Sequence, residues 1–469
     1  MLKVLHTGWW TLEYRKAGGS IIHVETLMEY LHRHGCENVY FCGGRYNLFA
    51  RSVYLKQWKK RFTKVYELVN SPNIVGSYES TPMHIQCEPI EKLFNKVLEL
   101  EKPNIIHFHE LESLAGSLLT TARLKNIPVV LDIHNYWYLC PQRDMMDTNQ
   151  GLCEDFANGE KCVSCVVITN NSRFGKIYGM YGGYFRNTAI GRLLDPLAIK
   201  FYAILNKWYY PLFNTIKPKQ LPASLFLKRR QFFVNELNKV QAIIFPSGKV
   251  KEIYARYKVT NENAILMPPI NINFSRIKPK NPYLHISPNK ITFGYIGSIL
   301  RTKGVHVIID ATRMLEKYKD RFQVFIFGGG DEFYTSQLKE KAKGSNIEFK
   351  GRYSPNEINK VLSYIDVGII PSIWEEIAGI VVSEFKLSKT PIIASRIGGI
   401  PEAVEHGVNG FLFEPGNAEE LAKYMKFFIE NPQEIPKFME RTNWSFDIDK
   451  YVGETIKIYK TAIEKLNGG

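Results

Sequence analysis

The sequence has no stretch of about eighteen uncharged apolar residues, so it predicts no membrane-spanning helix. Its first residues, MLKVLHTGWWTLEYRKAGG, also lack the apolar core and the small-residue cleavage site of a signal peptide. We therefore expect a cytoplasmic protein. No segment has the biased composition of a disordered or collagen-like chain, because 45% of the residues are apolar and 23% are charged.

The chain has 469 residues. This is about three times the length of a usual single domain, so we expect two large domains, or two domains with a sizeable insertion.

The positive charge is concentrated in the first part of the chain, because residues 1–269 carry +12 of the net charge of +15. Most of it lies in two blocks, Arg51 to Lys64 and Arg173 to Lys239, with six and twelve basic residues. Such blocks are typical of proteins that meet an anionic surface, and we expect an anionic membrane surface as a partner. No recognised nucleic-acid-binding module accompanies the charge, so a nucleic-acid partner is not expected.

Within the second block, apolar residues recur at helical spacing among basic and aromatic ones. They are Leu197, Phe201, Leu205 and Trp208. One interpretation is an amphipathic helix in a membrane interface, which would place the protein peripherally on the cytoplasmic face of the membrane. The other is a stripe packed on the protein's own core with a solvated basic face. The sequence leaves both open.

Residues 291–395 alternate between strand-like and helix-like segments. The strand-like segments include ITFGYIGSI, QVFIFGGG, IEFKGR and PIIAS, which are bounded by Gly and Pro and separated by helices of about ten residues. This pattern predicts a doubly wound parallel sheet, whose ligands bind at the carboxyl ends of the strands.

The first half repeats the pattern less regularly and predicts a second Rossmann-like domain. Its segments are LKVLHTG, a helix from about Ile22 to His34, NVYFCGG, NIIHFHE and PVVLDIHNYW. After Cys140 the pattern stops for roughly ninety residues, which is too long for an ordinary loop and indicates a functional insertion. The pattern returns at AIIFPS.

The most informative segment is PSIWEEIAGIVVSEFKLSKTPIIASRIGGIPEAVEHGVNGFLF, residues 371–413, in which Glu376 and Glu384 stand eight positions apart. A helix that begins near Gly379 would offer its free N–H groups and its dipole to a diphosphate. Glu384, further into the helix, and Glu376, on the loop before it, could each accept hydrogen bonds from a ligand. For a bare glutamate pair, solvated helix charges would be the better interpretation, so the flanking segments decide.

The flanking segments PS, GIV, PIIAS, GGIPE and GVNGFLF resemble those of glycosyltransferase family 4, the retaining glycosyl transferases group 1. The resemblance implies an α/β fold of the GT-B type, with two Rossmann-like domains facing across a cleft. Here the N-terminal domain would carry a cysteine-containing, basic and aromatic insertion. The resemblance also implies that Gly379, Ile380 and Val381 bind the donor, that Glu384 accepts hydrogen bonds from its ribose hydroxyls, and that Glu376 faces its sugar ring. The sequence departs from the family pattern at Ile377, Ala378 and Phe385, which concerns the identity of the sugar.

The segment GYIGSILRTKGVHVIIDA resembles the family's strand, loop and helix whose lysine neutralises the donor phosphates, and Lys303 matches that lysine. Its charge would stabilise the departing nucleotide diphosphate. Ser298 stands where the family commonly has Arg, and Arg301 is a candidate replacement. The predicted donor-binding set also includes Gly329 and Arg352.

Two motifs of the first domain also match the family. Gly18 and Gly19 precede a helix and resemble the glycine pair that lets the backbone approach the donor, although a simple turn would look the same. His134 ends a strand and matches a histidine that faces the reacting sugar. His107 and His109 fit a core or supporting role better. The resemblance thus implies Glu376, His134, Lys303 and Arg301 as catalytic residues.

Four cysteines, Cys140, Cys153, Cys162 and Cys165, have the spacing C-x12-C-x8-C-x2-C. The close pair is typical of a tetrathiolate site for zinc or an iron–sulfur cluster, and disulfides are disfavoured in a cytosolic chain. We interpret the site as structural rather than catalytic. The alternative is four reduced cysteines. No cofactor is expected to be required for catalysis.

The predicted organisation has three parts. They are an N-terminal acceptor-side domain (1–268, with the insertion at about 140–235), a C-terminal nucleotide-sugar domain (269–445) and a helix that crosses back to the first domain (446–469).

The resemblance implies transfer of a hexosyl group, with retention, from a nucleotide-diphosphate sugar such as a UDP- or GDP-sugar. A glycan or lipid-linked acceptor in cell-surface polysaccharide or glycolipid synthesis is expected. Three alternatives stay open: a GT-B epimerase or phosphorylase, a nucleic-acid-binding protein, and a non-catalytic membrane scaffold.

Overall fold

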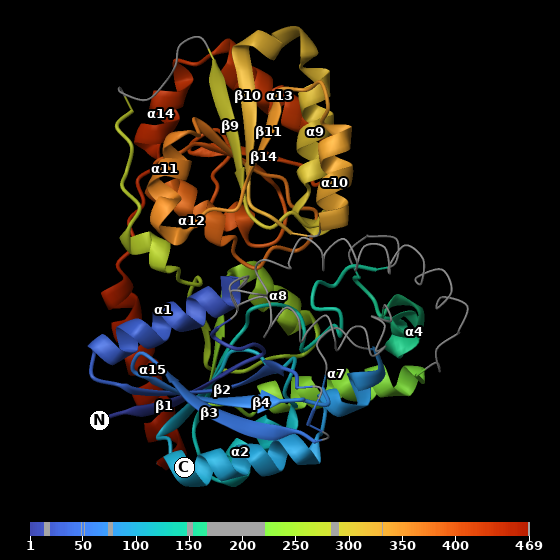
Figure 1. Ribbon diagram of the computed structural model, residues 1–469, viewed down its shortest axis with the longest axis vertical. Coiled ribbons are helices and arrows are strands. Elements are labelled where there is room, and N and C mark those ends of the chain that lie inside the picture. The colour runs from blue at the N-terminus through green and yellow to red at the C-terminus, as the bar shows by residue number, and fades with distance from the viewer. Residues whose placement is uncertain are drawn as a thin grey trace. The chain divides into compact units, whose positions relative to one another are not determined.

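The computed structural model describes most of the chain as two compact α/β units (Figure 1). The described residues are 1–13, 19–47, 49–50, 52–73, 78–147, 153–166, 221–282, 290–330 and 332–467. The N-terminal unit comprises residues 1–244, 254–265 and 453–469, and the C-terminal unit comprises residues 245–253 and 266–452. Gly18 and the apolar stripe at 197–208 lie outside the described residues.

The N-terminal unit is built on an eight-stranded sheet with the order β3-β4-β2-β1-β5-β6-β7-β8. The strands are β1 (Lys3–Gly8), β2 (Glu37–Arg45), β3 (Tyr54–Lys60), β4 (Thr63–Val69), β5 (Ile105–Phe108), β6 (Val129–Asp132), β7 (Ala242–Phe245) and β8 (Ala264–Leu266). From β4 to β7 the neighbours pair in parallel, and only β3 runs antiparallel to its partner β4. The central strands of this sheet, such as β5, β6 and β7, are buried and rich in Val, Ile and Leu, as expected for a sheet that is covered on both faces.

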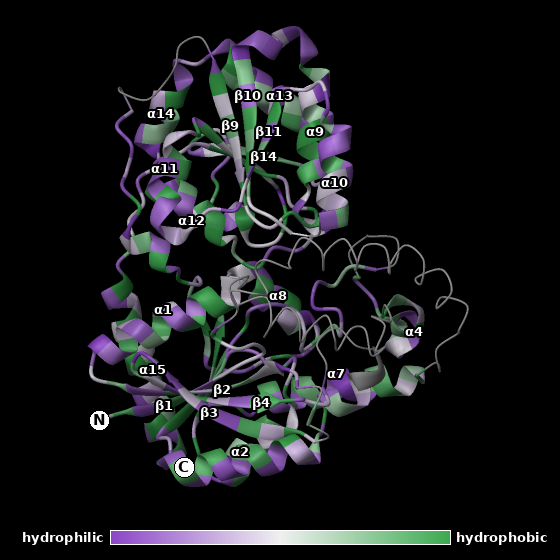
Figure 2. Ribbon diagram, viewed as in Figure 1, coloured by the Kyte–Doolittle hydropathy of each residue, from purple (hydrophilic) through white to green (hydrophobic). Residues whose placement is uncertain are grey.

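The described helices of this unit are α1 (Gly19–Arg33), α2 (Glu88–Glu101), α3 (Ser117–Leu124), α4 (Glu160–Cys165) and α7 (Ala223–Leu237), and two helices, α8 (Gly248–Arg256) and α15 (Ile448–Asn467), are shared between the units. Helix α2 shows why they form where they do. Ile90, Phe94 and Val97 are fully buried and recur every three or four residues, so one stripe faces the sheet. Figure 2 shows the same alternation of apolar and polar faces in other helices.

Residues 54–64 of the basic block lie in a hairpin, β3 and β4, which the sequence did not predict. Several of its charges are paired within the unit: Lys60 with Glu25, Arg61 with Glu29, and Lys64 with Glu101. These cations are therefore partly neutralised by the fold. The interpretation of this block as a surface for an anionic partner is weakened accordingly.

The C-terminal unit is built on a six-stranded parallel sheet with the order β11-β10-β9-β12-β13-β14. The strands are β9 (Ile291–Ile296), β10 (Phe322–Phe327), β11 (Ile347–Gly351), β12 (Val367–Ile370), β13 (Ile392–Ser395) and β14 (Gly410–Phe413). Numbered within the unit, this is the order 3-2-1-4-5-6 of a doubly wound nucleotide-binding sheet. The predicted parallel sheet is confirmed.

The helices of the C-terminal unit are α9 (Val305–Met314), α10 (Glu332–Lys341), α11 (Ile358–Ser363), α12 (Ile380–Leu387), α13 (Ala418–Glu430) and α14 (Glu434–Arg441). Buried residues of α9 and α13 join β9, β10 and β12 in one core cluster. Within the described residues, no helix has both the length and the apolar composition needed to cross a membrane.

Phe385 illustrates how a departure from the family pattern is accommodated. The side chain is fully buried in α12. It occupies the space above Gly368 of β12, where an added Cβ would lie 2.5 Å from the Phe385 ring. The glycine and the phenylalanine are therefore complementary in size.

We expect Phe385→Ala to lower the free energy of unfolding by about 3–5 kcal/mol, because it empties a packed site. Gly368→Ala overpacks the same site and is also destabilising. The double variant Gly368→Ala/Phe385→Ala should regain part of the loss, because the new methyl group fills part of the cavity. Urea unfolding of the four proteins tests this coupling, and strictly additive losses would contradict it.

Candidate active site

Two loops of the C-terminal unit meet where the strand order reverses. Strands β9 and β12 are neighbours in the sheet, and the chain leaves β9 toward β10 and β12 toward β13, in opposite directions. In such a sheet the crevice at the carboxyl ends of these two strands is the usual place for a ligand. The loop after β9 carries Arg301 and Lys303, and the loop after β12 carries Glu376 and Gly379.

The structure brings Lys303 and Glu376 into direct contact. The Lys303 ammonium forms an ion pair with Oε1 of Glu376, and the Ser372 hydroxyl donates to the same oxygen over 2.7 Å. Burial alone would raise the pKa of the Glu376 carboxyl, but the charge of Lys303 and these hydrogen bonds outweigh it and lower the pKa. The carboxyl therefore stays ionised and can accept hydrogen bonds from sugar hydroxyls.

Close backbone approach holds the two partners in place. A Cβ on Gly304, next to Lys303, would lie 1.8 Å from the carbonyl oxygen of Pro371. A Cβ on Gly398, which has a φ of +58°, would lie 2.1 Å from the carbonyl oxygen of Glu376. Only glycine allows both approaches, so the KG and GGIPE segments of the sequence position the ion pair.

The other glutamate has a different environment. Glu384 lies in α12, is 2% exposed, and accepts hydrogen bonds from the side-chain amides of Asn271 (3.2 Å) and Asn273 (2.7 Å). Burial raises its pKa to about 7, although the Asn273 hydrogen bond acts in the opposite direction. A buried carboxyl with a raised pKa is typical of a binding site, and hydroxyl groups of a ligand could donate hydrogen bonds to it.

Helix α12 begins as the sequence predicted. Gly379 precedes it with a left-handed φ of 60°, and Ile380 and Val381 form its first turn. The first N–H groups of a helix have no partner within it, and they carry the positive end of its dipole. An anionic group at this end would be bound by Gly379, Ile380 and Val381 through backbone donors.

The remaining predicted donor residues lie at the ends of neighbouring strands. Ser298 is exposed after β9, and its carbonyl accepts a hydrogen bond from the Tyr295 hydroxyl over 2.7 Å. Arg301 is exposed in the turn that leads to Lys303. Gly329 and Arg352 are adjacent, because a Cβ on Gly329 would lie 2.8 Å from Nε of Arg352. These four residues follow β9, β10 and β11, at the carboxyl ends of the strands, and none of them is part of the ion pair itself.

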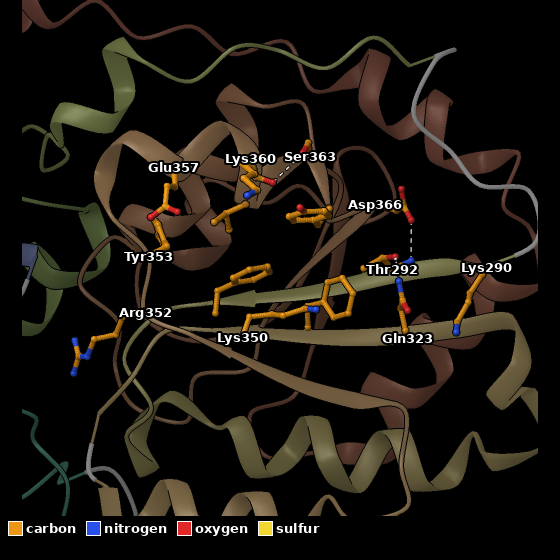
Figure 3. Close-up of a pocket in the computed structure, with 14 residues that line it drawn as sticks. Lys290, Thr292, Gln323, Lys350, Arg352, Tyr353, Glu357, Lys360, Ser363 and Asp366 are labelled. Atoms are coloured by element: carbon orange, nitrogen blue, oxygen red, sulfur yellow. Dashed lines mark hydrogen bonds between the residues drawn. The ribbon is translucent and has the colours of Figure 1, made fainter. Parts of the chain in front are cut away.

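A pocket of about 690 Å³ lies elsewhere on the C-terminal unit, along β9, β10, β11 and α11 (Figure 3). Arg352 lines it, whereas Lys303, Glu376 and Glu384 do not. We therefore take the reversal of strand order, rather than this pocket, as the candidate site, because it combines a cation, a helix N-terminus and buried carboxyl groups.

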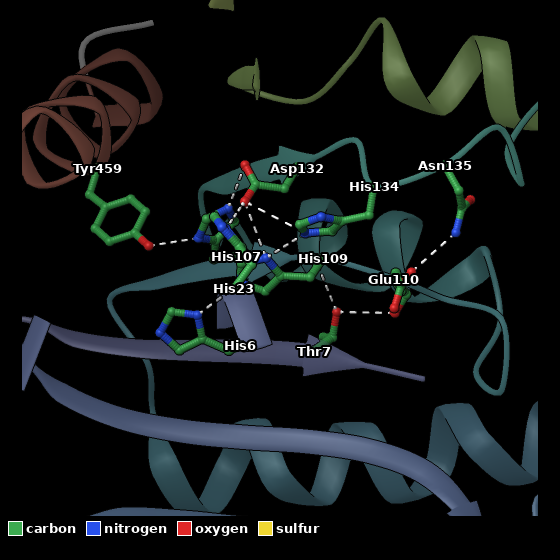
Figure 4. A network of polar contacts seen from close by, with 10 residues as sticks. All are labelled: His6, Thr7, His23, His107, His109, Glu110, Asp132, His134, Asn135 and Tyr459. Atoms are coloured by element: carbon green, nitrogen blue, oxygen red, sulfur yellow. Dashed lines mark hydrogen bonds and ion pairs between the residues drawn. The ribbon is translucent and has the colours of Figure 1, made fainter. Parts of the chain in front are cut away.

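The N-terminal unit has an equivalent reversal between β1 and β5, and a histidine network lies beside it (Figure 4). The carboxylate of Asp132, at the end of β6, lies 3.0 Å from Nε2 of His23, 3.2 Å from Nε2 of His107 and 3.2 Å from Nδ1 of His109. Nε2 of His134 lies 3.2 Å from Nδ1 of His109. Burial lowers the pKa of His134 to about 3, so its ring is neutral at physiological pH.

Hydrogen bonds extend this network to both sides. Nε2 of His6 must donate to the Asn38 side-chain oxygen (3.1 Å), because the amide nitrogen of Asn38 is already committed to the Met28 carbonyl (3.0 Å). On the other side, the Tyr459 hydroxyl of α15 lies 2.7 Å from Nδ1 of His107. The prediction that His107 and His109 are supporting core groups is confirmed, since both are fully buried.

Nitrogen and oxygen atoms of His23, His109, Asp132 and His134 lie within 4.8 Å of one another, as do those of His6, His107 and His109. In the part of the chain that the structure describes, these are the groups close enough to share a metal ion, and the four cysteines are not among them. The metal assignment for the cysteines stays a prediction.

Sequence reasoning missed two buried carboxyls of this unit, Glu110 and Glu112. Both accept hydrogen bonds from the Asn135 amide, over 3.1 and 3.0 Å, and Glu112 pairs with Arg143 over 3.2 Å. Burial and the neighbouring carboxyl raise the pKa of Glu110 well above its ordinary value. Both residues come directly after β5, where the strand order reverses. This position could have marked them as site residues, but it can be recognised only when the strand order is known.

The raised pKa of Glu384 makes a prediction about stability. The folded protein holds this proton up to about pH 7, whereas the unfolded chain releases it near pH 4.5. The contribution of this carboxyl to the free energy of unfolding is therefore fully present below its pKa in the unfolded chain, and it is lost as the pH rises through about 7. We expect Glu384→Gln to raise the free energy of unfolding by about 1–3 kcal/mol at pH 8 and to leave it nearly unchanged at pH 5.

Urea unfolding at both pH values measures this difference. Glu405→Gln, at an exposed glutamate of the same unit, is the matched control and should change neither value. If the wild type is more stable than Glu384→Gln at pH 8, the ionised carboxylate does not lower the free energy of unfolding, and the prediction is contradicted.

Comparison with known families agrees with this arrangement. The model "Glycosyl transferases group 1" matches residues 279–443, and the model "Glycosyltransferase Family 4" matches residues 17–158. Together the two matches cover most of the chain and include the donor loops and His134.

Among curated proteins, an uncharacterised glycosyltransferase of Methanocaldococcus jannaschii is 25% identical over 47% of this chain and 56% of its own length. A 2-deoxystreptamine glucosyltransferase of Streptomyces kanamyceticus is 28% identical over 30% of this chain and 37% of its own. The chain thus spans only about a third to just over half of these relatives.

Two solved structures have the same fold at low identity. HepE of Anabaena, in complex with UDP and glucose, aligns over 100% of both chains with a TM-score of 0.57 and 15% identity. Sucrose-phosphate synthase of Thermosynechococcus elongatus aligns over 98% of both chains with a TM-score of 0.64 and 14% identity. Three findings agree: the two α/β units, the two family matches, and the motifs that carry Lys303, Glu376 and Glu384. The chain belongs to the family-4 type of glycosyltransferases and has their GT-B fold.

Proposed function

We propose that the protein transfers a hexosyl group from a nucleotide-diphosphate sugar to an acceptor, with retention of the anomeric configuration. The observation that carries this proposal is the ion pair of Lys303 and Glu376 beside the start of α12, with Glu384 buried in the same helix. A cation and a helix terminus suit a diphosphate, and two buried carboxyls suit the hydroxyls of a ribose and a sugar.

A UDP-sugar is the preferred donor, with a GDP-sugar as the alternative. Support comes from structures with the same fold, which include HepE in complex with UDP and with UDP-glucose. Glu384 accepts hydrogen bonds from the ribose hydroxyls, replacing those that Asn271 and Asn273 provide in the ligand-free chain. Glu376 accepts them from the sugar.

In the proposed reaction the bond between the anomeric carbon and the diphosphate oxygen breaks. A bond from the acceptor oxygen to that carbon forms on the same face, and the hydroxyl proton passes to the departing diphosphate. Lys303 and the N–H groups of α12 stabilise the charge that develops on the leaving group, with Arg301 as a further cation. His134 positions the sugar, as the family resemblance implies. No step of this scheme uses a metal ion.

The acceptor is proposed to be a glycan or a lipid-linked sugar in cell-surface polysaccharide or glycolipid synthesis, met at an anionic membrane surface. The support is the excess positive charge of residues 1–269. Glycolipid and polysaccharide precursors are assembled at membranes, and basic segments are attracted to anionic headgroups at about 1 kcal/mol per residue near the surface.

The donor proposal predicts that one nucleotide family stabilises the protein. We expect UDP-sugars to raise the melting temperature and to be hydrolysed slowly, with GDP-, ADP- and TDP-sugars as comparisons. Glu384→Ala should abolish the shift, because a buried ribose partner is lost. No shift with any of these donors would contradict the proposal.

The role of close packing behind Glu376 is tested by a pair of glycine variants. Gly398→Ala should reduce donor hydrolysis by at least tenfold, because its methyl group displaces the Glu376 backbone. Gly407→Ala is the matched control, since Gly407 also has a positive φ but faces open space. Equal losses in both variants would show that backbone strain, rather than the position of Glu376, is responsible.

The membrane proposal predicts that the protein co-sediments with vesicles that contain anionic lipid and is released as the salt concentration rises, because exposed charges are screened. Vesicles of neutral lipid are the control. Failure to bind anionic vesicles at moderate salt would remove this part of the proposal and leave the donor site untouched.

A further inference from the structure

A buried cluster of imidazoles surrounds Asp132 in the N-terminal unit (Figure 4). His23 lies in α1, and His109 follows β5. Asp132 is the last residue of β6, and His134 comes two positions later. The side chains of these four residues are between 0 and 5% exposed. Three segments that are distant in sequence therefore bring nitrogen and oxygen atoms together in the interior of the unit.

The spacing of these atoms suits one metal ion. Oδ2 of Asp132 lies 3.0 Å from Nε2 of His23 and 3.2 Å from Nδ1 of His109. Nε2 of His134 lies 3.8 Å from the same oxygen and 3.2 Å from Nδ1 of His109. Atoms that bind a tetrahedral zinc ion at about 2.0–2.1 Å lie about 3.4 Å from one another. The four groups can therefore share one ion with only small shifts.

The hydrogen bonds behind His109 leave its Nδ1 without a proton. Nε2 of His6 donates to the Asn38 side-chain oxygen, because the amide nitrogen of Asn38 is bound to the Met28 carbonyl. His6 and His109 are fully buried, which favours neutral rings. A neutral His6 can then only accept at Nδ1, which lies 3.1 Å from Nε2 of His109. Nε2 of His109 therefore holds the one proton of that ring.

The bare Nδ1 of His109 faces groups that also offer electron pairs. Oδ2 of Asp132 and Nε2 of His134 both lie 3.2 Å from it. A proton on Nε2 of His134 would satisfy the nitrogen but leave the carboxylate against it, which is unfavourable in a buried site. A cation between these groups removes the repulsion. Rings that bind a metal through one nitrogen usually donate their other N–H to a neighbour, and His109 does so toward His6.

We propose that His23, His109, Asp132 and His134 bind one zinc ion in a structural site. Three neutral imidazoles and one carboxylate are common zinc ligands, and four protein ligands leave no position for substrate on the ion. The ion would connect α1 to the ends of β5 and β6. Binding through Nε2 keeps the proton of His134 on Nδ1, which is then the atom that His134 offers to the sugar. Only this last step rests on the proposed function.

The metal content of the full chain tests the proposal. Protein without a histidine tag, expressed with added zinc and dialysed against metal-free buffer, should retain zinc by mass spectrometry of the metal. His23→Gln should contain about one zinc fewer per chain than the wild type, because a ligand is lost. His32→Gln is the matched control, since His32 is exposed on the same helix and its loss should leave the zinc content unchanged.

The hydrogen bond between His109 and His6 provides a second readout. His6→Phe removes the acceptor and should weaken zinc binding by about 10–100-fold in competition with a chromophoric chelator, the range seen when groups around the ligands are removed. His6→Gln keeps an acceptor oxygen and should lose less affinity than His6→Phe.

If His23→Gln fails to fold, X-ray absorption by zinc in the wild type decides the question. Neighbours at about 2.0–2.1 Å are nitrogen and oxygen ligands, whereas sulfur ligands lie at about 2.3 Å. Sulfur neighbours alone, an unchanged zinc content in folded His23→Gln, or protein without zinc would each overturn the proposal. The last result would assign the positive charge at His109 to a second proton. No nucleotide is present in these measurements, so none of the outcomes bears on the donor site.

Discussion

The candidate site depends on the need of a buried carboxylate for a positive partner. Glu376 is 6% exposed, and an isolated carboxylate at such a site would take up a proton. The ammonium of Lys303 prevents this, and the two loops at the reversal of the strand order must be held together for the pair to form. Several other features follow from that constraint: Gly304 against Pro371, Gly398 against Glu376, and the Ser372 hydroxyl on the carboxylate.

The two glutamates are held in opposite states by their surroundings. Glu376 is kept ionised by a cation, whereas Glu384 has only amide donors, and burial raises its pKa to about 7. Among the described residues, Glu384 is therefore a buried carboxyl that forms no ion pair. Such a group is unfavourable for stability but well suited to recognise hydroxyls, a balance that is common where a binding site is formed before its ligand arrives.

Much of the fold could be predicted from the sequence, because apolar strands and short helices leave a strong local pattern. The parallel sheet of the C-terminal unit, the helix that ends before Gly35 and the start of α12 at Gly379 are all local features. The β3–β4 hairpin was missed because its lysines obscured the strand pattern and were interpreted as a surface charge. Their acidic partners, such as Glu25 and Glu101, are distant in sequence.

The donor residues were also predictable in part. The motifs predict the positions of Glu376, Glu384 and Lys303. The contrasting pKa values of the two glutamates depend on burial and on the contact between Lys303 and Glu376, which the spacing alone does not show. In the N-terminal unit, His23 and His109 become neighbours of His134 only once α1 and β5 lie next to β6. Long-range pairing of this kind is a property of the folded chain, so a single sequence could indicate His134 but not the network that holds it.

The most direct test of the donor site is calorimetric titration of UDP at pH 7 in two buffers with different ionisation enthalpies. If the ribose hydroxyls bind the ionised carboxylate of Glu384, UDP binding in the wild type will release a fraction of a proton to the buffer. The Glu384→Gln variant will bind more weakly and lose that release. Tight binding by the variant with the same proton release would contradict the account, because the buried glutamate would then have no part in holding the nucleotide.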